Sequence, residues 1–461
     1  MSYIAALTEF GEQVALVNDR NEKLTYLSLL NQVDLLAGQF SGGKKLVFVR
    51  CKNNFSTIIG YLAAIKSNNT VLMLDAKLSN ELFGHLVDIF HPDFIWQPVG
   101  DNEEYKLTVI QSKTDHVLHP DLTLLLSTSG SLGSPKLVKL TEKNILSNAR
   151  SIIEYLGITE TERAITTLPL HYSYGLSILN SHLLSGATLL LTDEPVTSRK
   201  FWDFFKTHDA TSFGGVPYTY EMLSRLRFER MSLPSLRYMT QAGGKLDVNL
   251  VKSFAQVAAD MGCKFYVMYG QTEATARISY LSSELVSDNP SSIGVAIPGG
   301  KVWIEDADHQ LIDSAGIEGD LVYQGDNVMM GYAESRKDLA LGDELKGILR
   351  TGDIAKKDEQ GLYYIVGRSK RFIKIFGNRV NLEDIELQLK KMNFDCVCGG
   401  IDNDLKVACL LGNDVNKIKQ YIVEQYKFHH SVVDVRKVKE FTKNSSGKIL
   451  YQEIFSNWEL T

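Results

Sequence analysis

The sequence predicts an α/β fold, in which a large N-terminal domain of layered sheets and helices carries a β subdomain and precedes a small α+β domain. Short, continuously apolar runs indicate strands covered on both faces, since half-exposed strands alternate instead. Segments with apolar residues at helical spacing separate these runs. After about Ser292, short strands and glycine-containing turns follow one another closely, which favours antiparallel structure. The 461 residues suffice for two or three folding units of about 150 residues each.

The N-terminal part contains five predicted buried strands. They are KKLVFVRC (44–51), TVLMLD (70–75), TLLLST (123–128), ATLLLT (187–192) and KFYVMYG (264–270). A helix is expected at 142–157, where apolar residues recur at helical spacing from Ile145 to Leu156. Thr141 can cap its start, and Gly157 can close its end.

The C-terminal part changes in texture. The β subdomain is predicted over SIGVAIPGGKVWIED, GDLVYQGDNVMMGY and GLYYIVGR, which begin at residues 292, 319 and 361. Beyond Gly367, the basic cluster SKRFIK precedes a helix, NLEDIELQLKKM, that Asn381 can cap. KVACLL, a second helix near 415–427 and VDVRKVKEF complete a compact α+β domain. The predicted domains are therefore residues 1–367 and 368–461.

Composition excludes several classes of function. The net charge of −6 gives no electrostatic case for nucleic acid or an anionic membrane. No uncharged apolar run approaches the ~18 residues of a membrane span, and MSYIAALTEFGEQ lacks the features of a signal peptide. Five cysteines at irregular spacing fit reduced thiols in a cytoplasm. Cys396 and Cys398 could form half of a metal site, but no second pair completes it, so we expect both to serve packing.

A Ser/Gly-rich loop follows the predicted strand at 123–128, within LLLSTSGSLGSPKLVKLT (124–141). It is not a Walker loop, because Pro135 stands where the second glycine belongs and Leu137 where Ser or Thr belongs. Glycines that turn backbone N–H groups toward an anion, hydroxyl donors and a lysine still suit phosphate. The residues concerned are Ser127, Thr128, Ser129, Gly130, Ser131, Gly133 and Lys136. A flexible turn is the alternative when such a cluster stands alone.

The string STSGSLGSPK resembles the phosphate loop of the adenylate-forming superfamily, which contains acyl-CoA synthetases, aryl-CoA ligases, luciferases and the adenylation domains of peptide synthetases. Further motifs of this superfamily follow in order, so that the resemblance covers nearly the whole chain. They are YMTQAGGKL (238–246), YGQTE (269–273), LRTGDI (349–354), GRSKRFIKIFGNRVNLEDIE (367–386) and NSSGKILY (444–451). No single motif is specific, but the ordered set is.

The resemblance implies a nucleotide site. Gly243 and Gly244 would let the base and the acyl group approach the backbone, and Tyr269, followed by Gly270, would stack on adenine. Thr272 would donate to the α-phosphate. The remaining contacts are assigned to three other residues: Glu273 as the Mg²⁺ ligand, Asp353 as acceptor of both ribose hydroxyls, and Arg368 at the ribose or phosphate.

The C-terminal motifs imply a domain that moves. Lys370 falls at the superfamily's hinge, while Lys374 and Gly377 fall on its thioester-forming face. For Arg371 we expect a solvated charged edge. Lys448 corresponds to the catalytic lysine of adenylate formation. The flanks depart from the common pattern, because Thr-Lys-Asn replaces Pro-Lys-Thr before the motif and Tyr451 replaces an arginine after it.

The implied reaction is ATP-dependent activation of a carboxylic acid, fatty or aryl, to an acyl-adenylate with release of pyrophosphate. Transfer to the thiol of CoA or of carrier-protein phosphopantetheine follows, so the expected cofactors are ATP and Mg²⁺. Rotation of the C-terminal domain about the hinge would exchange Lys448 for the thioester face. A carrier protein as partner is an open alternative to CoA, and so are a monomer and a homodimer. A cytoplasmic enzyme without nucleic acid is expected.

The acyl pocket is expected between LPLHYSYGLSILNS (168–181) and FGGVP (213–217). Its predicted lining is His171, Tyr172, Tyr174, Phe213, Gly214, Gly215, Val216 and Pro217. His171 could gate access of the carboxylate or simply pack in a loop. Amino-acid-activating members place an Asp here for the α-ammonium group, and 168–181 has no acidic residue, so an amino acid is disfavoured. A silent nucleotide-binding paralogue and a luciferase-like oxygenase are the alternatives from other classes.

Overall fold

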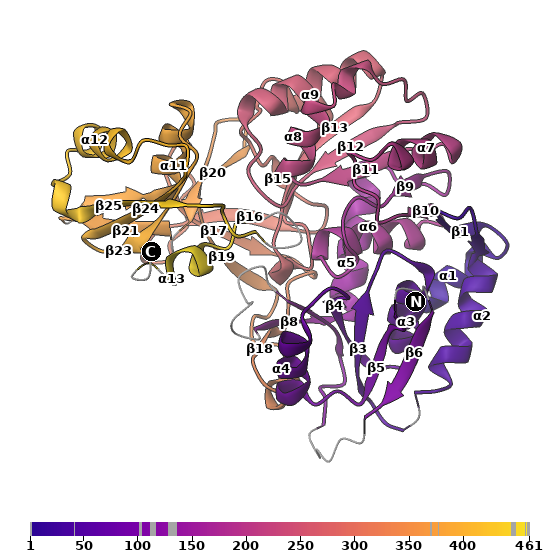
Figure 1. The fold of residues 1–461 in the computed structure, drawn as a ribbon. Helices are drawn as coiled ribbons and strands as arrows, with labels where there is room; N and C mark the ends of the chain where they lie inside the picture. The colour runs from indigo at the N-terminus through magenta and orange to yellow at the C-terminus, as the bar shows by residue number, and fades with distance from the viewer. Residues whose placement is uncertain are drawn as a thin grey trace. The chain divides into compact units, whose positions relative to one another are not determined.

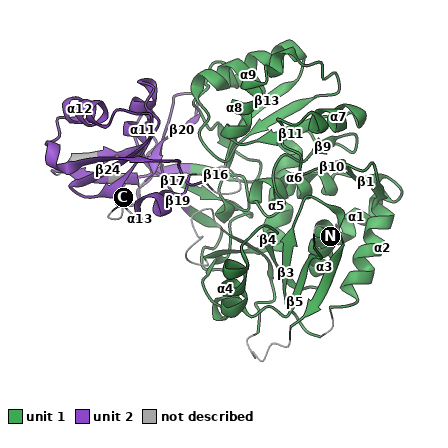
Figure 2. Ribbon diagram, viewed as in Figure 1, with its two compact units in different colours: residues 1–302, 322–349 green, residues 303–321, 350–461 purple. Residues whose placement is uncertain are grey.

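The computed structural model (Figure 1) describes residues 2–40, 42–100, 104–110, 117–127, 136–368, 371–376, 378–443, 449–456 and 458. The chain divides into two compact units (Figure 2). Unit 1 comprises residues 1–302 and 322–349, and unit 2 comprises residues 303–321 and 350–461. The predicted boundary between residues 367 and 368 refers to a different division, namely the start of a C-terminal domain that rotates during the reaction. That boundary stays a prediction. In the described part of the chain, no helix has both the length and the apolar character for a membrane crossing.

A seven-stranded sheet in unit 1 has the order β18-β8-β7-β4-β3-β5-β6. Its strands are β3 (Leu46–Cys51), β4 (Thr70–Asp75), β5 (Phe94–Pro98), β6 (Tyr105–Val109), β7 (Leu122–Ser127), β8 (Leu137–Thr141) and β18 (Gly331–Ala333). The central strands are parallel, and side chains from other elements cover both of their faces. Val47 belongs to one core cluster and Phe48 to another, with α3 (Phe55–Lys66) and α4 (Asn80–Phe90) contributing to opposite clusters.

A nine-stranded sheet forms the rest of the framework of unit 1, with the order β15-β14-β13-β12-β11-β9-β10-β1-β2. Its strands are β1 (Val14–Asn18), β2 (Lys23–Thr25), β9 (Arg163–Ile165), β10 (Thr188–Leu191), β11 (Ser212–Gly215), β12 (Tyr238–Gln241), β13 (Lys264–Tyr269), β14 (Ser279–Leu281) and β15 (Val295–Ala296). β11, β12 and β13 are parallel neighbours. Their carboxyl ends at Gly215, Gln241 and Tyr269 therefore share one edge, where ligands bind in open α/β sheets.

Two helices lie between the sheets in Figure 1: α5 (Glu142–Leu156) and α6 (Ser173–Leu184). α5 is the predicted helix. Thr141 and Asn144 form a capping box at its start, and Gly157 closes its end at φ 65°. The remaining helices of unit 1 are α1 (Tyr3–Leu7), α2 (Tyr26–Ala37), α7 (Arg199–Thr207), α8 (Pro217–Arg225), α9 (Val248–Met261) and α10 (Ser283–Val286). The 3₁₀ turns are η1 (Thr8–Phe10), η2 (Phe228–Arg230), η3 (Thr272–Ala274) and η4 (Arg336–Ala340).

A four-stranded sheet of order β16-β17-β19-β20 contains strands that cross the sequence boundaries of the units. It comprises β16 (Lys301–Glu305), β17 (Gly319–Gln324), β19 (Ile348–Lys357) and β20 (Tyr363–Arg368). The rest of unit 2 has a β21-β22 hairpin, a β23-β24-β25 sheet and three helices. Their bounds are β21 (Phe372–Ile375), β22 (Asn378–Asn381), α11 (Leu382–Lys391), β23 (Cys396–Ile401), β24 (Asp404–Leu410), α12 (Val415–Tyr426), η6 (His430–Val432), β25 (Val433–Val438) and α13 (Tyr451–Ser456). Cys398 and Cys409 are buried in this unit's apolar core.

Candidate functional site

The predicted phosphate loop joins two antiparallel neighbours, because Ser127 at the end of β7 pairs with Leu137 at the start of β8. Thr128, Ser129, Gly130, Ser131 and Gly133 lie outside the described residues. Lys136, at the end of the loop, places its ammonium group 3.7 Å from the centroid of the Tyr332 ring. This cation–π contact holds the lysine beside the loop.

Tyr332 also contacts the predicted metal ligand, since its hydroxyl donates a hydrogen bond of 2.8 Å to Glu273 Oε1. Burial, followed by the charge of Glu273, raises the pKa of Tyr332, so the phenol stays protonated as the donor. The backbone adds a second link, because Met329 N donates to Glu273 O at 2.9 Å. The structure thus brings Lys136 and Glu273 together on two sides of one side chain. Sequence reasoning missed Tyr332, which belongs to none of the motifs.

The YGQTE segment turns sharply after β13. A Cβ atom on Gly270 would lie 1.8 Å from the carbonyl oxygen of Ala276, so only glycine fits there. The turn leads into η3, where Thr272 Oγ1 lies 3.2 Å from Ser173 Oγ at the start of α6. Tyr269 is half-buried, and its hydroxyl accepts a hydrogen bond from Gln271 Nε2 at 3.2 Å. The geometry therefore places a threonine hydroxyl, a serine hydroxyl and the Glu273 carboxylate at the same sheet edge.

The two predicted glycines at 243 and 244 lie against the predicted acyl-pocket residues. A Cβ atom on Gly243, which has φ +83°, would lie 2.7 Å from the Tyr172 hydroxyl. A Cβ atom on Gly244 would lie 3.2 Å from Pro217 Cγ. The segments after β11 and β12 and the start of α6 therefore converge, as the shared sheet edge requires.

The floor of the predicted acyl pocket is tightly packed. The buried Tyr174 donates to Thr240 O at 2.9 Å, and a Cβ atom on Gly214 would lie 2.9 Å from its hydroxyl. A Cβ atom on Gly215 would lie 2.7 Å from the ring carbon Cε2 of Tyr220, and Phe213 packs edge-on against Phe228. A cavity of about 20 Å³ remains between α5, α6 and the sheet, and Phe213 and Gly214 are among its lining residues.

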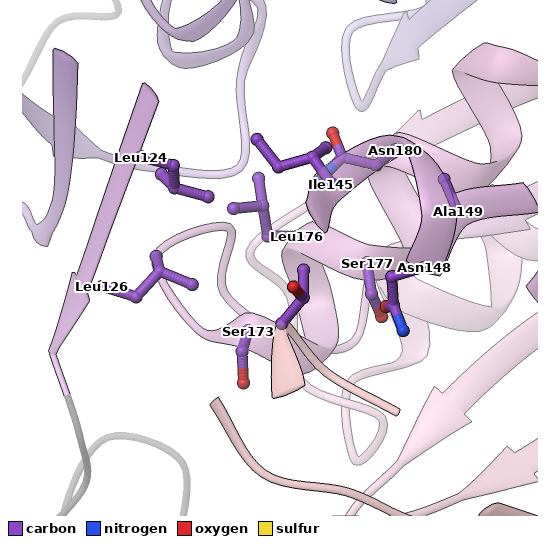
Figure 3. A pocket seen from close by; sticks show the side chains of 10 residues that line it. Leu124, Leu126, Ile145, Asn148, Ala149, Ser173, Leu176, Ser177 and Asn180 are labelled. Atoms are coloured by element: carbon purple, nitrogen blue, oxygen red, sulfur yellow. The ribbon is translucent and has the colours of Figure 1, made fainter. Parts of the chain in front are cut away.

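A second cavity, of about 10 Å³, lies closer to Thr272. Figure 3 shows Ser173, Ser177 and Asn148 around it, with Leu124 and Leu126 of β7 opposite. Ser177 lines both cavities, which therefore meet α6 at adjoining positions. Each holds about one water molecule at most.

His171 is largely buried, and its Nε2 lies 3.9 Å from Asp75 Oδ2. Burial lowers the pKa of His171, while the charges of Asp75 and Asp193 oppose that shift. The imidazole is therefore neutral near pH 7. A neutral ring beside the start of α6 is compatible with both roles that the sequence left open for it, gating and packing.

In unit 2, Asp353 and Arg368 are direct partners in the β19–β20 ladder, with Arg368 Nε 3.2 Å from Asp353 Oδ1. Asp353 is 3% exposed and follows Gly352, which adopts φ +75° within β19, a backbone conformation that favours glycine. Lys374 is exposed on β21, where its backbone N–H donates to Asp402 Oδ1 at 2.7 Å. Lys370, Gly377 and Lys448 lie outside the described residues.

The prediction of a solvated edge for Arg371 is wrong. Its guanidinium donates to Glu386 Oε1 at 2.5 Å and to Cys398 O at 2.6 Å, and it lies 3.9 Å from the centroid of the Tyr451 ring. Tyr451 in turn donates to Glu386 Oε2 at 3.1 Å. The basic string suggested solvent, but Tyr451 offers an aromatic face and a hydroxyl to this cluster.

Comparison with known proteins identifies the family. The model of the AMP-binding enzyme family matches residues 91–333, more than half of the chain. The chain belongs to the AMP-binding enzyme family. The prediction of an adenylate-forming enzyme is thereby confirmed, whereas the roles of the individual site residues stay predictions.

Two curated relatives are carrier-protein ligases. The D-alanine–D-alanyl carrier protein ligase of Staphylococcus haemolyticus (strain JCSC1435) is 25% identical over 437 residues, covering 89% of this chain and 87% of that protein. The ligase of the same name from Lacticaseibacillus rhamnosus is 27% identical over 428 residues, covering 85% and 83%.

Solved structures confirm the fold. O-succinylbenzoate coenzyme A synthetase (MenE) from Bacillus subtilis, in complex with AMP, has a TM-score of 0.81 at 20% identity and covers 98% of both chains. ATP-bound MatB from Rhodopseudomonas palustris has a TM-score of 0.78 at 17% identity, covering 100% of this chain and 99% of that one. The predicted α/β architecture with a smaller C-terminal part is therefore confirmed.

Proposed function

We propose that this enzyme activates a carboxylic acid with ATP, releases pyrophosphate, and transfers the acyl group from the adenylate to a thiol. The observation that carries the proposal is the polar cluster of Lys136, Tyr332, Glu273 and Thr272 beside the loop that follows β7. An ammonium group and a phenol from the seven-stranded sheet meet a carboxylate and a hydroxyl that follow β13 of the nine-stranded sheet, and together these groups suit a triphosphate. Membership in the AMP-binding enzyme family supports the same nucleotide.

The reaction joins two anions, so charge control decides its rate. A carboxylate oxygen attacks the α-phosphorus, and pyrophosphate leaves with the electron pair of the bond that breaks. Thr272 would donate to an α-phosphate oxygen, and Ser173, 3.2 Å away, would fix the direction of that hydroxyl. Lys136 would offset charge on the outer phosphates, and Lys448 is assigned to the α-phosphate by its motif.

Magnesium fits the carboxylate at Glu273. Mg²⁺ is commonly held by one or two carboxylates together with phosphate oxygens and water, so a cage made only of protein groups is not required. Accordingly, the described residues contain no group of three His, Cys, Asp or Glu side chains that could hold a metal ion. The hydrogen bond from Tyr332 would orient Glu273 toward the ion, which neutralises phosphate charge when bound.

For the acceptor we propose the phosphopantetheine thiol of a carrier protein. The support is that the curated relatives named above are carrier-protein ligases and match over most of their length. Free CoA presents the same thiol, and it is the alternative that the experiment must separate. The exposed Lys374 on β21 would belong to the face that meets this thiol arm.

Isotope exchange between ATP and pyrophosphate across a panel of fatty, aryl, dicarboxylic and amino acids tests the first half-reaction. The acid that supports exchange is then supplied with CoA or with a pantetheinylated carrier protein, and thioester formation is measured. We expect exchange with at least one acid and faster transfer to the carrier. Absence of exchange with every acid would refute the proposed function.

A further inference from the structure

Arg277 is buried, and within the described parts of the chain it has no counter-ion. It follows η3 and is 3% exposed. Nη1 donates to Ala276 O at 3.3 Å, near the limit for a hydrogen bond, and Nε has no hydrogen-bond partner. The guanidinium carbon lies 4.1 Å from the centroid of the Tyr174 ring. Among the residues that the structure describes, no carboxylate forms an ion pair with Arg277.

Arg336, which is also buried, differs from Arg277 in having a counter-ion. Arg336 is 5% exposed, but it forms an ion pair of 3.2 Å with Asp93 and donates to the carbonyl oxygens of Phe90 and His91. Isolated burial of a charge costs far more free energy than burial of a paired one. Arg277 has a side-chain hydrogen bond with Tyr155 but no carboxylate partner among the described residues, which indicates that the anion that balances its charge comes from elsewhere.

The side chains around Arg277 do not supply negative charge. Burial raises the pKa values of Tyr155, Tyr172 and Tyr174, and the positive charge of Arg277 only partly opposes these shifts. All three phenols stay protonated at neutral pH. They leave Arg277 in a site that is aromatic, nearly closed to water and positive.

The position of Arg277 relates this site to the acid. Arg277 lines the cavity of about 20 Å³ together with Gly214, Thr240 and Ser177. Ser177 also lines the smaller cavity that reaches Ser173, whose hydroxyl is 3.2 Å from Thr272 Oγ1 (Figure 3). Arg277 and Thr272 are thus connected through two cavities that share Ser177.

We propose that Arg277 binds a second carboxylate of the acid, and that the substrates are short dicarboxylic acids. This inference rests on the proposed function and narrows it. One carboxylate reacts at the α-phosphate beside Thr272, while the other forms an ion pair with Arg277 in the cavity. The cavity has room for about one water molecule, so it has to widen around the second carboxylate, and a short spacer needs less widening than a long alkyl chain. The same positive charge opposes the ammonium group of an amino acid, in line with the absence of acidic residues from 168–181.

Matched acids test this inference. Exchange between ATP and pyrophosphate is measured for malonate against propionate, succinate against butyrate and glutarate against valerate. D-alanine is measured separately as a further candidate substrate. We expect the wild type to prefer a diacid over the monoacid of equal length. Arg277→Gln should lower kcat/KM for that diacid by about 10- to 100-fold and leave the monoacid within about threefold, because only the diacid loses a charged hydrogen bond.

Two further variants keep the test decisive. Arg277→Lys retains the charge and should keep part of the preference, whereas Arg336→Gln removes a paired arginine and should lower stability without changing the diacid-to-monoacid ratio. If Arg277→Gln does not fold, the wild-type ratio and Arg277→Lys still decide. Exchange with monoacids or D-alanine as good as with diacids, or an equal loss for both acids in Arg277→Gln, would overturn the role of Arg277 and leave the ligase intact. No exchange with any acid would instead refute the proposed function.

Discussion

Tyr332→Phe tests whether the bridge between Lys136 and Glu273 serves catalysis. The substitution keeps the ring that lies 3.7 Å from the Lys136 ammonium and removes only the hydroxyl that donates to Glu273 at 2.8 Å. A hydrogen bond to a charged group contributes about 1.5–3 kcal/mol. Because Tyr332 is half-buried, solvent replaces part of this, and we expect the lower end, about 1.5 kcal/mol, which is roughly tenfold.

The assay is exchange between ATP and pyrophosphate as a function of Mg²⁺ concentration. We expect Tyr332→Phe to need about tenfold more Mg²⁺ for half-maximal rate or to lose an equivalent factor in kcat, because Glu273 is no longer oriented. Tyr323→Phe is the matched control, since its hydroxyl donates at 2.7 Å to Asn327 in the buried core. It should reduce thermal stability without altering the Mg²⁺ dependence. A Mg²⁺ dependence of Tyr332→Phe within twofold of the wild type would refute the reasoning.

The other predictions concern three positions. Lys448→Ala should abolish adenylate formation but keep thioester formation from supplied acyl-adenylate, and equal loss of both half-reactions would contradict its assignment. Gly270→Ala should destabilise the fold by about 3 kcal/mol or more in chemical denaturation, because its Cβ would lie 1.8 Å from a carbonyl oxygen; Gly84→Ala, with open space around it, is the control. Burial lowers the pKa of His182 from 6.5 to about 4. Between these two pH values the unfolded chain binds a proton at His182 and the folded chain does not. Stability should therefore fall by about 3 kcal/mol between pH 6.5 and 4 through His182, and a pH titration of stability should show a shallower slope for His182→Gln than for the wild type.

The fold could be predicted from the sequence because its signals are repetitive. Strands such as 70–75 are buried on both faces and show continuous apolar character, and α5 carries both a cap and a terminal glycine. Such patterns repeat over many residues, so local and global preferences agree. The sheet order, in contrast, depends on pairings between distant strands such as β8 and β18, which no local pattern encodes.

The site was only partly predictable, for a related reason. Motifs identified Thr272 and Glu273, since each stands within a fixed string. Tyr332 contacts Lys136 and Glu273, and Arg277 lines the cavity, only because the fold brings distant residues together; neither lies within a motif, although Arg277 follows YGQTE by only four residues. A charge that looked solvated from its neighbours, Arg371, is enclosed because Tyr451 and Glu386 reach it from distant positions.

The stacked pair of Arg371 and Tyr451 bears on how this enzyme can be engineered. Stepwise design changes one position at a time and assumes that positions contribute independently, which fails for residues in contact. Arginine at position 451 would set a second guanidinium against Arg371 and remove the phenol that shares Glu386. That change made alone would therefore lower stability. The effects of substitutions at Arg371, Glu386 and Tyr451 depend on one another, so these three residues have to be exchanged together.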